Sequence, residues 1–434
     1  MAEIRPLRAL RYDPARVGDL SRVLCPPYDV LSADDEEALR ARHPRNYVRL
    51  ILPREEGGLD RYRAAAALLD AWRADGTLRL DPAPAFYFYE QEYRLGSSEP
   101  VRRRGIFALV RLHEFSEGVV LPHEQTLPAP REDRYRLLEA TRAHFDPIFG
   151  LYSDPERAVD RLFERVAQGP PLVAAQDPDG VSHRLWLSER EQDLSAVASS
   201  LDGRWVLIAD GHHRYESALR YARSQPASGA ARPFDYVLMV LCNIDSGGLT
   251  VLPIHRVVRA LPEFSLGAWL ERLGAWFDVR PLELGAGEAQ SAARVEAALS
   301  PHSGRGGAFV LAPASGRACL LTLRQGFDGE RELGASVPAP LRRLDVTLAH
   351  TLLFERGLGI SPDEQLRQTV VQYSKSAAAA LAEVASGRAQ AAVLLNPTPI
   401  EAVVEATHAG LRMPPKSTFF HPKLVSGLVI HPFA

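Results

Sequence analysis

The chain has 434 residues, of which 46% are hydrophobic and 24% charged, enough for a large buried core and two or three domains. Its formal net charge of −3 gives no overall field for nucleic acid or for an anionic membrane surface. The three cysteines lie far apart without a metal-binding spacing, and no apolar run reaches membrane length. We therefore expect a cytoplasmic globular protein with no nucleic-acid partner and no membrane partner.

Residues 1–116 form the first predicted region, a mixed α/β region that ends in a hairpin. The hairpin is expected because two aromatic and β-branched segments flank the polar turn GSSEPVRRR. The predicted elements are a strand over 7–12, a loop LCPPYDVLS, helices over 33–42 and 59–74, and hairpin strands over 85–95 and 104–115.

Residues 117–260 form the second region, which begins with the Pro-rich loop LPHEQTLPAPRED. After this loop, segments whose apolar residues recur at helical spacing alternate with segments that have the pattern of a strand. The predicted helices cover 134–145, 154–167 and the stretch from 215, and the predicted strands cover 147–153, the surroundings of 172, 183–187, 205–208 and 234–244.

Residues 261–434 form the third region, a C-terminal α/β lobe. We expect a helix over 266–277, Gly- and Ser-rich spacers near 285–307, strands over 308–313 and 318–323, a helix, turn and strand over 378–397, and a helix over 399–410. The fold class predicted for the whole chain is therefore mixed α/β.

The stretch WVLIADGHHRYESALRYA places Asp210, Gly211, His212, His213 and Arg214 between a buried strand and a helix. A helix N-terminus has N–H groups without intrahelical partners and a partial positive charge, so it suits an anion such as phosphate. Four side chains that carry charge or protons exceed what capping needs. The alternative is that Asp210 is a cap and the histidines are solvated residues of the first turn.

His123, Glu124 and Gln125 stand in a loop bounded by prolines, where neither a regular helix nor a central strand can form. A carboxylate held in a stiff loop is well placed to act as a general base. The alternative for Glu124 is a solvated surface acid.

Near the C-terminus, the segment MPPKSTFFHPK brings one cation and two hydroxyls together in Lys416, Ser417 and Thr418. This combination suits phosphate, although the spacing of a Walker loop is absent. The alternative is a polar turn before a terminal strand. Lys423 is expected to assist this cluster, and His421 is expected at the surface.

The segment LCPPYDV presents Tyr28 and Asp29 on a backbone stiffened by two prolines. These two side chains are weak candidates for binding a substrate amine, and a purely structural loop is the alternative. Cys25 has no neighbouring histidine to serve as its base, so a nucleophilic role is not expected.

The order of these motifs resembles that of the free-serine kinases of the ParB/sulfiredoxin superfamily. His123-Glu124-Gln125, Asp210 to Arg214 and Pro415 to Thr418 carry the resemblance, which covers roughly 117–260 and 385–425. Over its whole length the chain also resembles a large prokaryotic family described only as a domain of unknown function. The resemblance implies a ParB/sulfiredoxin-like core, with the N-terminal region and the C-terminal lobe added to it.

The resemblance implies transfer of a phosphoryl group to free L-serine, giving O-phosphoserine, with ADP or ATP as donor and Mg²⁺ as cofactor. Glu124 would then be the base, and Asp210 would hold Mg²⁺ or assist the base, with His123 beside them as a further catalytic candidate. Gly211 to Arg214 would contact nucleotide phosphates, and Lys416 to Thr418 would grip the transferred phosphate. Such chemistry asks a protein mainly for alignment and charge neutralisation.

Several departures limit the resemblance. His212 stands where sulfiredoxins have a cysteine, and the single Arg214 replaces the paired arginines of the nucleotide-binding ParB proteins. Alternatives to a kinase are a regulatory nucleotide-binding protein without catalysis, a phosphoserine phosphatase that runs the reaction in reverse, and a hydrolase in which His212 or His213 accepts phosphate.

Overall fold

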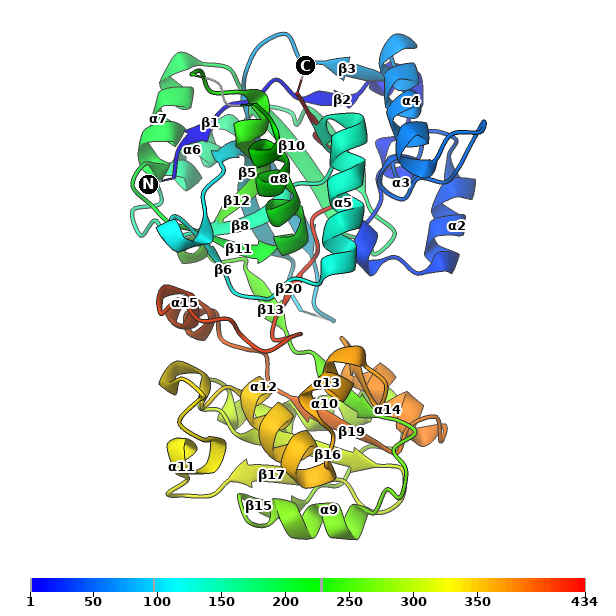
Figure 1. Ribbon diagram of the computed structural model, residues 1–434, viewed down its shortest axis with the longest axis vertical. Coiled ribbons are helices and arrows are strands. Elements are labelled where there is room, and N and C mark those ends of the chain that lie inside the picture. The colour runs from blue at the N-terminus through cyan, green and yellow to red at the C-terminus, as the bar shows by residue number, and fades with distance from the viewer. Residues whose placement is uncertain (1, 97, 227–228, 434) are drawn as a thin grey trace. The chain divides into compact units, whose positions relative to one another are not determined.

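A computed structural model describes residues 2–96, 98–226 and 229–433. The chain divides into two compact units, the first formed by 1–249 with 422–434 and the second by 250–421 (Figure 1). Both units combine sheets and helices, which confirms the mixed α/β class. The division into three regions at 116 and 260 stays a prediction.

Nine strands within the described residues form the main sheet of the first unit, in the order β6-β11-β8-β12-β5-β4-β10-β9 with β1 beside β5. The sheet is mixed, because β11 is parallel to β6 and antiparallel to β8. The strands are β1 (Ile4–Arg5), β4 (Phe86–Tyr93), β5 (Val101–Arg111), β6 (Val120–Pro122), β8 (Ile148–Tyr152), β9 (Val173–Gln176), β10 (Ser182–Ser188), β11 (Val206–Asp210) and β12 (Tyr236–Asn243).

The predicted hairpin is confirmed, because β4 and β5 pair in antiparallel register with Tyr87 opposite Phe107. Two short pairs accompany the main sheet: β2 (Leu10–Tyr12) with β3 (Leu78–Leu80), and β7 (Ala143–His144) with β21 (His431–Pro432).

Side chains cap some of the helices of the first unit. Ser32 and Asp35 form a capping box at the start of α2, and Asp60 caps α4. The helices are α1 (Pro14–Val17), α2 (Ala33–Arg42), α3 (Val48–Ile51), α4 (Arg61–Ala74), α5 (Pro128–Thr141), α6 (Ala158–Val166), α7 (Glu191–Leu201) and α8 (His212–Ser224).

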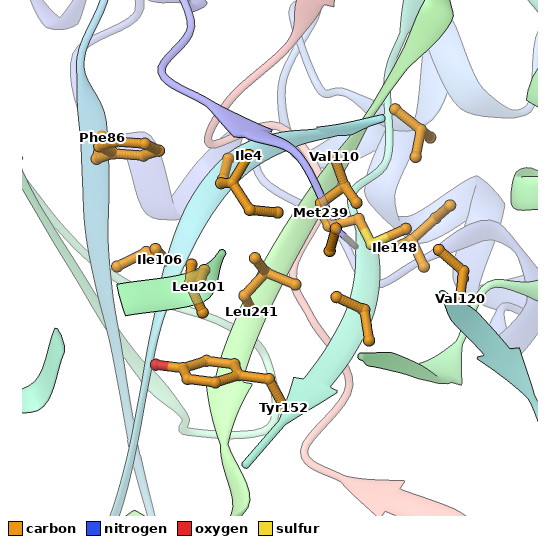
Figure 2. Packing of buried hydrophobic residues seen from close by; sticks show 14 of the residues in the cluster. Ile4, Phe86, Ile106, Val110, Val120, Ile148, Tyr152, Leu201, Met239 and Leu241 are labelled. Carbon is orange, nitrogen blue, oxygen red and sulfur yellow. The ribbon is translucent and has the colours of Figure 1, made fainter. Parts of the chain in front are cut away.

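One face of the main sheet carries α5 to α8 and an extensive apolar core (Figures 1 and 2). Ile106 of β5, Ile148 of β8 and Met239 of β12 point into this core. Along each strand every second side chain points to this face, as strand geometry requires. The opposite face is contacted by the C-terminal tail, since Gln91 donates to the carbonyl of Lys423 over 2.9 Å. This contact brings the tail to the sheet that also carries β11.

Two expectations for the first unit are wrong. The Pro-rich stretch is only partly a loop, because α5 starts at Pro128, where a proline fits the first helical position. The helix α7 was not predicted, although Leu194, Val197 and Leu201 stand at helical spacing and pack against the core.

The second unit has its own sheet of six described strands, in the order β15-β17-β16-β19-β14-β18. These strands are β14 (His255–Val258), β15 (Phe277–Pro281), β16 (Ala308–Pro313), β17 (Cys319–Leu323), β18 (Val371–Ser374) and β19 (Ala391–Leu395). A separate pair joins β13 (Thr250–Leu252) and β20 (Phe419–His421).

The helices of the second unit are α9 (Leu266–Leu273), α10 (Glu288–Leu299), α11 (Gly329–Leu333), α12 (Asp345–Leu348), a π-helical stretch over Ala349–Arg356, α13 (Pro362–Arg367), α14 (Ala377–Ala385) and α15 (Ile400–His408). The helix-turn-strand-helix unit expected over 378–410 is confirmed by α14, β19 and α15. The expected spacer near 285–307 is wrong in part, because it contains α10, whose Val295 and Leu299 are buried.

No helix among the described residues combines the length and the apolar character that crossing a bilayer requires.

Candidate functional site

The candidate site of the first unit begins where β11 ends and α8 starts. Gly211 is the N-cap of α8 and has φ of +98°, a conformation that side chains other than glycine rarely adopt. A Cβ atom at this position would lie 2.9 Å from Cζ of Arg214. No side chain of the described residues caps α8 at Gly211, and the N-terminus of a helix carries a partial positive charge that suits an anion.

Asp210, the last residue of β11, is bound by two cations. Arg214 lies one helical turn away and donates from Nη2 to Oδ2 over 2.7 Å, while Nζ of Lys423 pairs with Oδ1. The side chains of Asp210 and Lys423 each keep 16% of their surface exposed. Burial by itself raises the pKa of Asp210, but Lys423 and Arg214 outweigh it and hold that pKa below its ordinary value. The carboxylate is therefore ionised, with both oxygens engaged.

The two histidines of the motif hold the loop that carries Glu124. The backbone N–H of His123 donates to Nε2 of His212 over 3.2 Å, and the N–H of Leu127 donates to Nε2 of His213 over 2.9 Å. Thr126 adds a hydrogen bond of 2.7 Å to Glu216 on the next turn of α8. The strand-turn-helix motif and the loop are thus one structure, although about ninety residues separate them in the chain.

These contacts also fix the protonation of the rings. A neutral histidine ring accepts through its unprotonated nitrogen, so Nε2 is unprotonated in both His212 and His213. Burial lowers the pKa of His213, while the charges of Glu124, Glu216 and Asp29 oppose the shift. His213 therefore stays neutral at pH 7, and the carboxylate of Glu124 lies close enough to act on its titration.

His123 is buried, with 1% of its surface exposed, and its Nδ1 lies 2.8 Å from the carbonyl oxygen of Ile208 on β11. Its ring meets that of His212 edge to face, with centroids 4.7 Å apart. The side chain thus joins the loop to the strand that ends at Asp210.

Tyr28 and Asp29 also lie near this site. The guanidinium of Arg134 lies over the ring of Tyr28, 4.0 Å from its centroid. Burial raises the pKa of Tyr28, and the charge of Asp29 raises it further, while Arg214 and Arg134 oppose the shift. The structure thus brings Tyr28 and Asp29 to the same side of the first unit as Arg214, and their role in binding an amine stays a prediction.

Lys416, Ser417 and Thr418 belong to the second unit. Lys416 has φ of +57°, Ser417 donates to the carbonyl of Pro414 over 2.5 Å, and its own carbonyl accepts from Thr398 over 2.7 Å. The segment is therefore a fixed turn. That Lys416 to Thr418 meet Asp210 at one phosphoryl group stays a prediction.

Sequence reasoning missed Arg256 on β14, which is fully buried. Its Nη2 donates to the carbonyl of Lys416 over 3.2 Å, and its Nη1 donates to the carbonyl of Ile254. Burial lowers the pKa of Arg256 to about 10. This side chain helps to hold the Lys416 turn, and no sequence signal marks it, because a lone arginine in a strand pattern usually faces solvent.

The residues present do not fit a resident Mg²⁺ ion. Mg²⁺ takes about six oxygen ligands and usually one or two carboxylates beside phosphate and water. Both oxygens of Asp210 are already occupied by Lys423 and Arg214, and no cluster of three or more ligating side chains occurs within the described ranges. The metal role of Asp210 stays a prediction that this geometry does not support.

Comparison with known proteins places the chain in a family. Residues 4–347 match the profile of the family described as "Protein of unknown function (DUF1015)". The chain belongs to this family. The match confirms the resemblance to a family described by a domain of unknown function, and no curated protein matches this DUF1015 chain significantly in sequence.

Among solved structures, the DUF1015 chain is similar to a free serine kinase in complex with AMP, with 15% identity, a TM-score of 0.35, and coverage of 73% of this chain and 86% of that one. It is also similar to a conserved hypothetical protein from Pyrococcus furiosus, with 15% identity, a TM-score of 0.34, and coverage of 74% and 92%. SbnI from Staphylococcus aureus, truncated at its C-terminus, has 11% identity, a TM-score of 0.31, and coverage of 74% and 86%. These likenesses are too distant to carry a functional argument.

Proposed function

We propose that this protein is a phosphotransferase that moves a phosphoryl group between a nucleotide, ADP or ATP, and the hydroxyl of a small hydroxy amino acid, with free L-serine as the substrate. The main support is the arrangement in the first unit, where a helix N-terminus with Arg214 and Lys423 adjoins the loop of Glu124. The choice of serine follows from the motif order described above.

In this proposal Glu124 accepts the proton of the acceptor hydroxyl. The carboxylate needs a defined position for that role, and the hydrogen bonds from the backbone of His123 and Leu127 to the two histidines hold the loop on both sides of Glu124. His212 and His213 thus position the base. The motif also predicts that these rings contact the donor phosphates. Because Nε2 of each ring accepts a backbone hydrogen bond, that contact would use Nδ1.

The cationic side chains act on the charge of the transferred group. Asp210 holds Lys423 and Arg214 next to the positive end of α8, where an oxyanion gains most from fixed donors. Lys416, Ser417 and Thr418 would bind the same phosphate from the second unit.

The experiment incubates the full chain with L-serine and each of ATP, ADP and pyrophosphate, with and without Mg²⁺, and detects O-phosphoserine by mass spectrometry. L-Alanine, which lacks the hydroxyl, is the matched acceptor control. O-Phosphoserine formed with one nucleotide supports the proposal. Nucleotide binding by calorimetry without any phosphorylated product would contradict it and favour a regulatory nucleotide-binding protein.

A further inference from the structure

The N-terminal helices α2, α3 and α4, together with the loops that join them, line a cavity of about 470 Å³ that the proposed reaction does not use. One wall is apolar and is formed by residues of α4, namely Ala64, Ala65, Leu68 and Trp72. Arginines line the remainder. Such a combination of apolar surface and a few polar groups is typical of small-molecule sites, whose volumes run from about 300 to 1,000 Å³.

Three of the four arginines at this cavity are neutralised by carboxylates. Arg40 and Arg54 each pair with Glu36 over 2.7 Å, and Arg45 pairs with Asp75 over 2.7 Å. The pairs of Arg54 join the loop after α3 to α2, and the pair of Arg45 joins the loop before α3 to the end of α4. Because each of these cations faces a carboxylate, the three bring little net charge to the cavity.

Arg49 differs from the other three. No carboxylate among the described residues lies within ion-pair distance of it, and its one hydrogen bond runs from Nη2 to the carbonyl of Arg40 over 3.1 Å. Within the part of the chain that the structure describes, Nε of Arg49 is buried without a hydrogen-bond partner, and Nη1 makes no hydrogen bond but is not buried. A guanidinium so poorly compensated favours a negative group beside it.

We propose that this cavity binds a small organic anion, with its carboxylate or phosphate on Arg49 and its apolar body on the α4 wall. Among the described residues, Glu56 is the one carboxylate that lines the cavity, and no ion pair joins it to another of them. Because Glu56 repels negative charge, a molecule with a single anionic group fits better than a polyanion. The site would give a binding role to the first hundred residues, which the resemblance leaves without one.

A purely structural Arg49 would only brace the carbonyl of Arg40 between α2 and α3. The two interpretations differ in ligand binding. A bracing arginine affects thermal stability alone, whereas a binding arginine also sets the affinity for an anion and its dependence on salt.

The test titrates the full chain with benzoate, phenyl phosphate and uncharged benzyl alcohol, using calorimetry and ligand-observed NMR. The variants are Arg49→Met, Arg49→Lys, and Arg63→Met as a control on an exposed arginine of α4 outside the cavity. Binding of benzoate or phenyl phosphate should weaken about tenfold or more in Arg49→Met, less in Arg49→Lys, and not in Arg63→Met. Benzoate and phenyl phosphate distinguish the two anionic groups.

The result that would overturn the proposal is equal binding in the wild type and Arg49→Met, no binding of either anion, or benzyl alcohol binding as well as the anions. If Arg49→Met is unstable, the test uses Arg49→Lys instead. It then also measures how much the affinity of the wild type for the anions falls between 50 and 500 mM salt. His213→Ala should leave this binding unchanged, which separates it from the proposed phosphotransfer.

Discussion

Replacing Lys423 by methionine removes one of the two cations that hold Asp210. The exposed fraction of 16% on both partners places this pair between a surface pair, worth up to about 1 kcal/mol, and a buried pair, whose disruption costs about 3–5 kcal/mol. Arg214 remains to neutralise the carboxylate. We therefore expect Lys423→Met to lower the free energy of unfolding by about 2 kcal/mol at pH 7, or the thermal midpoint by about 4–8 °C.

The pH dependence has a defined sign. The pKa of Asp210 is depressed in the folded protein, so its contribution to stability is complete above the ordinary carboxyl pKa of about 4 and is lost as the pH falls below it. In Lys423→Met the pKa of Asp210 rises toward its ordinary value. The stability difference between the wild type and the variant should therefore shrink between pH 5 and pH 2.

The assay is denaturant unfolding of the wild type, Lys423→Met, Asp210→Asn and the double variant, each at pH 7 and pH 3. Interacting side chains give a coupling energy of about 0.5–3 kcal/mol in such a cycle. Effects that add to within about 0.3 kcal/mol, or a difference that does not change with pH, would refute the pairing of Lys423 with Asp210.

Two further predictions concern the motif. His213→Ala removes the acceptor of the Leu127 N–H. Hydrogen exchange at that amide should therefore accelerate about fivefold, the effect of one lost hydrogen bond. An unchanged exchange rate would mean that His213 does not hold the loop. Gly211→Ala should destabilise the protein by more than Gly180→Ala in thermal unfolding. Both glycines have positive φ, but a Cβ atom meets Arg214 at 2.9 Å only at Gly211, and equal losses would contradict the close packing there.

The spacing of apolar residues in the sequence predicted most of the helices and strands in which that spacing is regular. The hairpin of β4 and β5 and the strand β16 follow from local residues. The helices α7 and α10 were not predicted, although each has buried apolar residues at helical spacing, such as Val197 and Leu201 in α7. These short stripes stand among serine, alanine and acidic residues, which weakens the periodic pattern.

Within the site, local spacing predicted the turn at Asp210 and the loop of Glu124. The partners that define their chemistry come from distant parts of the chain. Lys423 reaches Asp210 from 213 residues away, and Leu127 donates to a histidine 86 residues later. No local pattern shows that His212 and His213 accept from backbone N–H groups, since both rings also suit a phosphate site.

The most direct test of the central claim is the initial rate of O-phosphoserine formation, with serine and nucleotide saturating, in the wild type, Glu124→Gln and Glu132→Gln. Glu132 lies on α5 and pairs with Arg220 and Arg136 on the exposed side, which makes it the matched control. Loss of a general base should slow Glu124→Gln by about 10²–10⁴-fold and leave Glu132→Gln at the wild-type rate. A rate in Glu124→Gln equal to that of Glu132→Gln would contradict the assignment of the base.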